Sequence, residues 1–390
     1  MFTSPVPAYK GASTDTRRQG NRKADTNHKG TVSGGHGTRL LVLVAALSLA
    51  SGQEVQSGFA IPFTLTGAAM HSHRGENEGA STVQGGFRAM LYPQVKLGPH
   101  WFGYAAIQIH QSPFFYEEAF ENEREFEVHI LQAYAGYSLV SGSRAITFKA
   151  GQLISAFGSF LPRYDDARNS LIDLPPSYGY YYKPVTSYGM PGVEANIVLT
   201  KTDLRFQFTN SSPANPRHLW DGDQYGSWTV GGGYSIRQSF RIGGSMYRGP
   251  YLDRHHRFFF PGESPPKRLP ATGLGVDIQY AHGRYTLNGE WQRFQFDYTR
   301  IPNFVTTTGY AEAKVTLNPR WYLALRTGWR RANLAPAGET VEVALGFRPA
   351  SHHLVKIGYA AAPARNVSGA RDNVFGVQYV VSFNPPAVAF

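Results

Sequence analysis

The chain has 390 residues, of which 17% are charged and 14% are aromatic, and its mean hydropathy is -0.32. This balance is too polar for a bundle of membrane-spanning helices, so it leaves a soluble globular protein or a membrane-spanning β-barrel. The formal net charge is +11, and the chain contains no cysteine. The lack of cysteine excludes a disulfide framework, thiolate catalysis and cysteine metal sites.

An apolar run of about eleven residues, Leu40 to Ala50, follows Arg39 and a long basic leader. Small residues come next, at Ala50-Ser51-Gly52. This order is typical of a secretory signal with its cleavage site, and the run is too short to span a bilayer. A buried core helix is the alternative. We therefore expect residues 1–52 to be a signal peptide that is removed, and residues 53–390 to form the mature domain.

Removal of this leader also changes the charge balance. The leader holds seven of the 38 basic residues and two of the 27 acidic residues, so the mature chain is closer to neutral. Its remaining basic residues are spread through alternating segments and do not cluster on one face, so we expect no nucleic-acid partner.

Segments in which apolar and polar residues alternate recur along the rest of the chain, as expected for β-strands with one apolar face. Most have roughly the 9 to 11 residues that a tilted strand needs to cross a bilayer. They predict an all-β fold, a transmembrane antiparallel β-barrel of about 16 strands. The segments lie at about residues 58–70, 83–97, 101–110, 126–139, 144–153, 188–200, 203–210, 226–236, 240–249, 271–282, 284–297, 304–317, 321–332, 339–349, 352–361 and 374–384.

The connections between these segments alternate in length. After every second segment the turn is tight, as at Gly98-Pro99-His100 and Asn318-Pro319-Arg320, whereas the other connections are longer, as at Gln111 to Glu125. Short turns on one side and long loops on the other are typical of outer-membrane barrels. A soluble sandwich has no reason to keep this asymmetry through consecutive hairpins.

The two faces of the segments differ in polarity. Leu204, Phe206 and Phe208 alternate with Arg205 and Gln207. A soluble sandwich shows the same alternation, so the ends of the strands are more informative. A membrane interface favours amphipathic aromatic rings. Such residues gather beside the short turns, at Trp101, Tyr137, Tyr234, Phe240, Tyr280, Tyr285, Trp321 and Phe347.

The last predicted strand carries apolar residues at every second position, from Phe375 to Phe383, and the sequence ends on Phe390. It resembles the terminal strand of bacterial outer-membrane porins, in which a closing aromatic residue is recognised by the barrel-insertion machinery. Either Phe383 or Phe390 is the insertion signal that this resemblance implies, because the tail after Phe383 departs from the family pattern. The resemblance also implies a barrel at residues 53–390 in the outer membrane of a Gram-negative-type bacterium, and it allows a homotrimer.

The stretch from Gly151 to Ser187 has no alternating pattern, and a connection of this length inside a compact fold is usually functional. Its Gly151-Gln152 and Phe157-Gly158 pairs resemble the strand-into-loop pattern of phosphate-selective porins, although Ala156 stands where that pattern prefers proline. The general porin resemblance implies a long third extracellular loop that folds inward and constricts the pore. The constriction residues that we expect are Arg163, Asp165, Asp166, Arg168 and Asp173.

Within this loop, Asp165 and Asp166 are the carboxylates expected to face a basic wall across the constriction. An equally weighted alternative is that they cap a short helix that begins near Ala167. The loop carries three basic and three acidic residues, so any preference for anions should come from the wall.

The face opposite the apolar one should line the lumen. Its basic side chains outnumber its acidic ones, which predicts an anion-leaning channel. Salt bridges within the wall would weaken this preference, and a one-residue bulge would reverse several of the facing assignments. The basic candidates are Arg88, Lys96, Lys149, Arg205, Arg241, Lys314, Arg326, Arg330, Arg348 and Lys356, against Asp203, Asp277, Glu290, Glu312 and Glu342.

These observations together predict a porin, a water-filled channel for passive diffusion of small solutes. No motif for catalysis, metal binding or a cofactor was found, so we expect no enzyme activity and no cofactor. The expected partners are outer-membrane lipid, the insertion machinery and small anionic or neutral solutes. One alternative is a structural or adhesion barrel with a closed lumen whose outside loops bind a partner, and a soluble secreted β-protein is a third interpretation.

Overall fold

The computed structural model describes residues 57–72, 83–112, 114–116, 126–175, 177–178, 189–210, 226–251, 262–265, 268–333, 335–361 and 373–390. The predicted signal peptide, residues 1–52, lies outside the described residues and stays a prediction. In the described part of the chain, no helix is long and apolar enough to cross a membrane.

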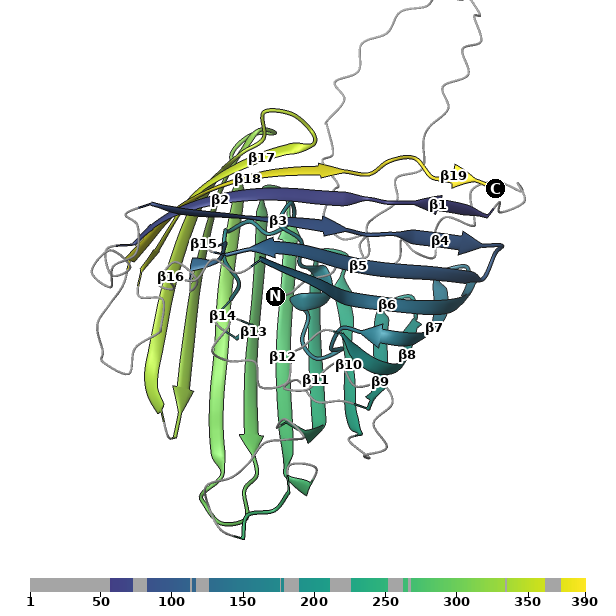
Figure 1. Cartoon of the computed structure of the whole chain (residues 1–390), viewed down its shortest axis with the longest axis vertical. Helices are drawn as coiled ribbons and strands as arrows, with labels where there is room; N and C mark the ends of the chain where they lie inside the picture. The colour runs from purple at the N-terminus through teal and green to yellow at the C-terminus, as the bar shows by residue number, and fades with distance from the viewer. Residues whose placement is uncertain are drawn as a thin grey trace, which may run out of the picture.

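The described strands form one closed antiparallel barrel of sixteen strands, and each strand pairs with its neighbours in the chain (Figure 1). Thirteen strands are continuous and three are interrupted, so the elements number nineteen. The predicted fold is confirmed, with strand ends within a few residues of those expected. The strands are β1 (Gly58–Ala60), β2 (Phe63–Ser72), β3 (Gln84–Leu91), β4 (Gln94–Leu97), β5 (Trp101–Gln111), β6 (Phe126–Ser141), β7 (Arg144–Leu153), β8 (Met190–Val198), β9 (Thr202–Thr209), β10 (Ser227–Arg237), β11 (Phe240–Pro250), β12 (Pro270–His282), β13 (Tyr285–Phe296), β14 (Phe304–Thr316), β15 (Trp321–Ala332), β16 (Ala335–Phe347), β17 (His353–Ala361), β18 (Asn373–Phe383) and β19 (Val388–Ala389).

The three interruptions contain proline, which cannot donate an amide hydrogen bond to a neighbouring strand. Pro62 separates β1 from β2, Pro93 lies between β3 and β4, and Pro385-Pro386 separates β18 from β19. Neighbouring strands stay hydrogen-bonded at two of these breaks, where the Tyr92 amide donates to the Pro62 carbonyl oxygen over 2.8 Å. The breaks therefore bend the strands without opening the wall.

The barrel closes between the first and last strands. β18 pairs with β2 along its whole length, from Val374 opposite Ser72 to Phe383 opposite Phe63. Beyond the proline break, β19 pairs with β1, and the Phe390 amide donates to the Ser57 oxygen over 3.1 Å. The tail that departs from the porin pattern is thus a continuation of the closing strand.

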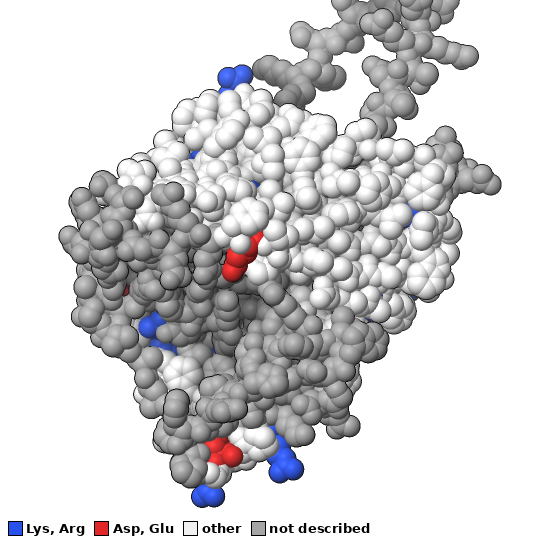
Figure 2. Space-filling view, viewed as in Figure 1, with Lys and Arg blue, Asp and Glu red and all other residues white. Residues whose placement is uncertain are grey.

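The outer face of the wall is apolar and exposed. On β15, Leu323 and Leu325 point outward and are 41% and 49% exposed, whereas the alternating Ala324 and Arg326 point inward and are almost fully buried. Figure 2 shows a broad surface without Lys, Arg, Asp or Glu over much of the strand wall. Such a surface suits lipid and not water, so the barrel spans a membrane and the soluble interpretation is disfavoured.

Candidate channel constriction

The loop that follows β7 folds into the barrel, as the resemblance predicted. Its described part, residues 154–175 and 177–178, has nearly all of its apolar side chains buried, including Phe157, Leu171 and Ile172. Only a short 3-10 turn, Leu161–Arg163, interrupts its irregular course. We call this segment the inner loop. Because it contacts strands on opposite sides of the barrel, its position is set by the wall.

The first anchor of the inner loop lies against β9, β11 and β13. The Gly158 amide donates to the Ser245 hydroxyl over 3.0 Å, and Arg205 donates to the Gly158 carbonyl oxygen over 3.0 Å. Gly158 has a φ of +74°, and a Cβ there would lie 1.9 Å from the Tyr178 hydroxyl. Glycine is therefore required at this bend, for its backbone conformation and for space.

Glu290 of β13 completes this anchor. It accepts hydrogen bonds from the Ser159 amide, at 2.7 Å, and from the Ser159 and Tyr178 hydroxyls. Burial and the Glu290 carboxylate raise the pKa of Tyr178 well above its usual value, so the phenol keeps its proton and remains a donor. Phe157 packs against Phe294 with 5.0 Å between ring centres.

The second anchor uses both candidate constriction aspartates. Asp166 accepts a 3.0 Å bond from Arg88 Nε and a 3.0 Å bond from the Thr66 hydroxyl, and Arg88 also forms an ion pair with it. Asp165 accepts from the Thr64 hydroxyl over 3.1 Å and from the Tyr92 hydroxyl. The two carboxylates are thus buried against β2, β3 and the residues that follow β3.

This burial bears on the two hypotheses for Asp165 and Asp166. Asp165 caps a single turn, since its side chain accepts from the Ala167 amide over 2.8 Å and its carbonyl accepts from the Asn169 amide over 2.7 Å, but no helix follows. Burial tends to raise the pKa of Asp166, but the Arg88 and Lys356 charges outweigh it and hold that pKa below its usual value. The Asp166 carboxylate is therefore charged and directly paired with the wall.

The third anchor joins the loop to β15, β16 and β17 through its backbone. Lys356 donates to the Asp166 and Leu171 carbonyl oxygens over 2.7 and 3.0 Å. Glu342 accepts from the Ile172 and Asp173 amides over 2.9 and 3.1 Å. Buried backbone groups need partners, and here inward side chains of the wall supply them.

Most of the predicted wall residues point inward or toward the loop, but many of them are paired with acids. Lys96 of β4 is half-buried, and the burial of β4 does not alternate between two faces. Arg241 lies between Asp203 and Asp277, at 2.8 Å from each. Arg326 lies between Glu312 and Glu342, at 2.8 and 3.2 Å. Glycines make room for the first of these groups, because a Cβ at residue 233 would meet the Arg241 guanidinium at 2.2 Å.

One wall carboxylate was missed by the sequence reasoning. Glu194 of β8 points inward and binds Lys149 over 2.8 Å. Its neighbours Val193 and Ala195 are more exposed, so the same alternation that assigned the other strands could have identified it. Lys149, Arg241 and Arg326 of the wall therefore all have acidic partners. Such ion pairs were expected to weaken the preference for anions.

Four predicted basic residues have other surroundings. Arg205 donates to the loop carbonyl named above, and Arg348 donates to the Ala167 carbonyl oxygen over 3.2 Å. The Lys314 ammonium lies 4.7 Å from the centre of the Tyr322 ring. Arg330 is buried on the inward face of β15. The first three place positive charge beside the inner loop without an acid–base pair in the described structure.

The remaining candidate loop residues are less central. Arg163 folds back onto its own loop and donates to the Ser159 carbonyl oxygen over 2.6 Å. Arg168 and Asp173 are partly exposed, and the Asp173 side chain accepts from the Leu174 amide over 2.7 Å. No group of three or more His, Asp or Glu in the described ranges could hold a metal ion.

A second segment also enters the barrel. Phe114, Phe115 and Tyr116 follow β5 and are at most 3% exposed, and they pack with the inner loop in one apolar cluster. The Arg88 guanidinium lies 4.9 and 5.1 Å from the two phenylalanine ring centres. Sequence reasoning placed this segment in an outside loop, although three consecutive aromatic residues are unusual in a solvated loop.

The two candidate insertion residues lie at the closing strand. Phe383 ends β18 and is in contact with Phe63, with 5.8 Å between ring centres. Phe390 follows β19 and is 68% exposed. Both are outward or terminal aromatics, and their part in insertion stays a prediction.

No family model and no curated protein matches the sequence. Solved structures do match the fold. OprB of Pseudomonas putida has a TM-score of 0.58 and 10% identity, over 84% of this chain and 94% of that one. The outer-membrane channel DcaP of Acinetobacter baumannii has a TM-score of 0.57 and 11% identity, over 85% and 99%. The trimer form of the outer membrane protein OmpT of Vibrio cholerae has a TM-score of 0.53 and 10% identity, over 84% and 100%.

At these identities the likeness establishes the fold. The chain has the sixteen-stranded barrel fold of outer-membrane porins, as the terminal strand and the loop pattern indicated. The predicted placement in the outer membrane agrees with that fold and with the exposed apolar wall.

Proposed function

We propose that this barrel is an outer-membrane porin, a water-filled channel for passive diffusion of small solutes. The observation that carries the proposal is the inner loop, which is held at three places on the barrel wall by buried hydrogen bonds and ion pairs. A segment held in this way narrows the lumen at a constant position. The channel needs no catalytic residue, so we assign it no enzyme activity.

We further propose that the channel prefers anions. Its selectivity should be weaker than the number of inward basic residues alone would indicate. The acids of the wall already neutralise Arg241, Arg326 and Lys149. Arg205, Lys314 and Arg348 have no such ion pair in the described structure and would supply the positive potential beside the loop. Asp165 and Asp166 are bound to the wall, so we give them an anchoring role and not the acidic side of a transverse field.

The test is a planar-bilayer recording of the purified chain under a salt gradient. The proposal predicts stepwise conductance, with a reversal potential on the anion-selective side. K314Q with R348Q should move that potential toward zero or to the opposite sign, and the effect should shrink at high ionic strength because salt screens the charges. R144Q, at an outward position near a turn, is the matched control and should leave the potential unchanged. Absence of stepwise conductance would contradict the proposal.

A structural or adhesion barrel is the second candidate, because side chains of the inner loop and of residues 114–116 pack together in buried apolar clusters inside the barrel. Deletion of residues 158–187 separates the two functions. A channel should conduct more or lose selectivity. A closed scaffold should show no stepwise conductance before the deletion, and the deletion should abolish binding to its external partner.

The OmpT structure of Vibrio cholerae is described as a trimer. We propose a homotrimer for this chain, to be checked by light scattering in detergent. A monomer under conditions that retain conductance would contradict it.

A further inference from the structure

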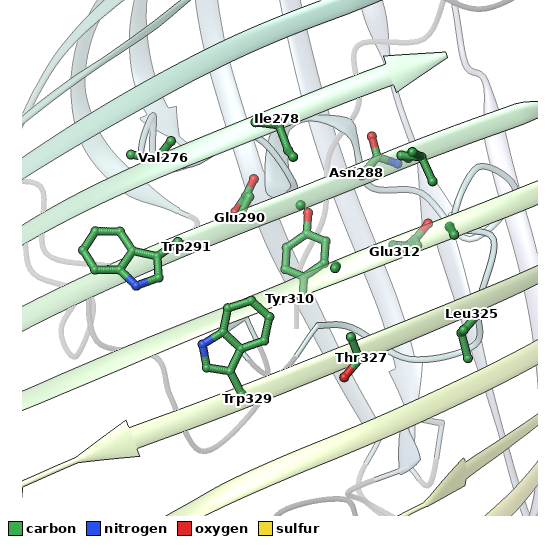
Figure 3. A pocket seen from close by; sticks show the side chains of 14 residues that line it. Val276, Ile278, Asn288, Glu290, Trp291, Tyr310, Glu312, Leu325, Thr327 and Trp329 are labelled. Atoms are coloured by element: carbon green, nitrogen blue, oxygen red, sulfur yellow. The ribbon is translucent and has the colours of Figure 1, made fainter. Parts of the chain in front are cut away.

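An apolar groove lies on the outer wall of the barrel, away from the inner loop. It has a volume of about 530 Å³ and follows the direction of β14 (Figure 3). Residues of β12 and β13 line it on one side of β14, and residues of β15 line it on the other. The floor consists of the small residues Gly289, Ala311 and Ala313. The sides are large outward side chains, among them Trp291, Trp329, Ile278 and Leu325.

Strand register explains this shape. Gly309 of β14 is opposite Trp291 on one side and Trp329 on the other, so the two indoles stand at one end of the groove. A Cβ at Gly309 would lie 2.3 Å from the Trp329 ring, which therefore folds over the strand. Further along, Ala313 is opposite Leu287 and Leu325. The groove therefore follows the strand direction on the lipid-facing wall.

Two arginines lie directly beyond the tryptophans. Arg293 and Arg331 are both opposite Thr307 of β14, one register step past the Trp291 and Trp329 positions on the same face. Both are exposed, and within the described residues neither guanidinium has a hydrogen bond or an ion pair. A cationic side chain on the lipid face costs about 2–4 kcal/mol at the midplane and about 0–1 kcal/mol near an interface. Both positions therefore fit the membrane interface, where an arginine can meet the anionic part of a lipid headgroup.

The lengths of the connections between strands identify the end of the barrel at which the arginines lie. Arg293 is near the end of β13 and Arg331 is near the end of β15, opposite the end that carries the tight turns at residues 283–284 and 317–320. That is the side of the longer loops, which faces outside in outer-membrane barrels. The groove and the arginines thus belong to the outer leaflet.

A third outward arginine widens the charged row. Arg248 of β11 is exposed near its loop-side end and donates to the Thr272 hydroxyl over 3.3 Å. Strands lie about 4.8 Å apart, so β11, β13 and β15 spread the three arginines over roughly 19 Å. A single phosphate could not bind all three, whereas a headgroup with two or more phosphates could. Glu339, opposite Trp329, is an exposed acid beside the three arginines, and it lowers the positive charge of the row without cancelling it.

We propose that this groove binds an acyl chain of a phosphorylated glycolipid of the outer leaflet, with its phosphates held by Arg293 and Arg331. The apolar floor and sides accept the chain, and the tryptophans mark the boundary between chain and headgroup. The site depends on the barrel spanning an outer membrane, but it does not depend on conduction.

The test measures binding of bisphosphorylated lipid A to the full chain refolded in detergent, by native mass spectrometry. The double variant R293Q/R331Q should weaken binding at least tenfold, whereas R144Q, an outward arginine at the turn end of β7, should not. A311W should also weaken binding because it fills the groove, and A150W on the outward face of β7 is its control. All four variants should keep the wild-type conductance.

Three outcomes would overturn the proposal. One is equal lipid A binding by wild type and R293Q/R331Q. Another is phosphatidylglycerol binding as tightly as lipid A with the same sensitivity to the arginines, which would indicate a general anionic phospholipid. A change of oligomeric state in A311W with unchanged lipid binding would instead make this face an interface between copies.

Discussion

The pairing of Arg88 with Asp166 is the residue contact on which the inner loop depends most. Both side chains are at most 1% exposed, and the pair joins residues 78 positions apart in sequence. Buried ion pairs are costly to form but more costly to break, because the remaining partner is left charged and buried. The pair therefore specifies where the loop lies more than it adds to stability.

The first prediction concerns removal of one partner. D166N should destabilise the barrel by about 3–5 kcal/mol, because Arg88 would keep its charge without a carboxylate. The double variant R88L/D166L should lose less than D166N does. Urea unfolding followed by tryptophan fluorescence measures all three proteins. Equal stabilities for D166N and wild type would show that the pair contributes nothing.

The second prediction concerns pH. The pKa of Asp166 is below its usual value, so its stabilising effect is complete above the unfolded-state pKa of about 3.9 and is lost as the pH falls through the lower folded-state pKa. Wild-type stability should therefore fall steeply below about pH 4. D166N should show a smaller fall over the same range. Parallel pH profiles for the two proteins would contradict the assignment.

At the scale of the element, the inner loop is defined by its bend at Gly158. A left-handed conformation costs a non-glycine residue about 1–2 kcal/mol, and here the added Cβ would also displace Tyr178 from Glu290. G158A should therefore cost more stability than the backbone strain alone, and it should make the single-channel current noisier as the loop loses an anchor.

Gly142 provides the matched control for this third prediction. It has a φ of +57° in the turn between β6 and β7, and a Cβ there would meet nothing within 4 Å. G142A therefore measures the cost of backbone strain alone, without loss of a contact like that between Tyr178 and Glu290. Thermal unfolding and bilayer recordings compare the two variants, and an equal loss in both would mean that the Tyr178 contact does not hold the loop.

The strands could be predicted because their signal is local. The alternation of apolar and polar residues and the turn residues can be recognised within about ten positions of sequence. The inward direction of Arg205, Arg241 and Arg326 was therefore predicted together with their strands. The anchors of the inner loop could not be predicted, because Asp166 and Arg88 meet only after the barrel closes. The entry of Phe114 into the lumen was missed for the same reason: it depends on space that the wall and loop create together.

At the scale of the whole molecule, closure depends on both halves of the last strand. β18 covers β2, and β19 supplies the second neighbour of β1, whose other partner is β4. An unpaired strand edge inside a membrane leaves amide and carbonyl groups without partners, which costs several kcal/mol for each group. The tail from Asn384 to Phe390 is therefore expected to be part of the seam.

The last prediction separates this structural part from an insertion signal. Truncation after Phe383 removes the β19 pairing and should lower the thermal stability of the refolded barrel, whereas F390A keeps the backbone pairing and should refold like the wild type. In cells, F390A should reduce outer-membrane assembly only if Phe390 is the signal, and F383A should do so if Phe383 is. Gel migration with and without heating measures folding, and fractionation measures assembly. Normal thermal stability after truncation would show that β18 alone closes the barrel.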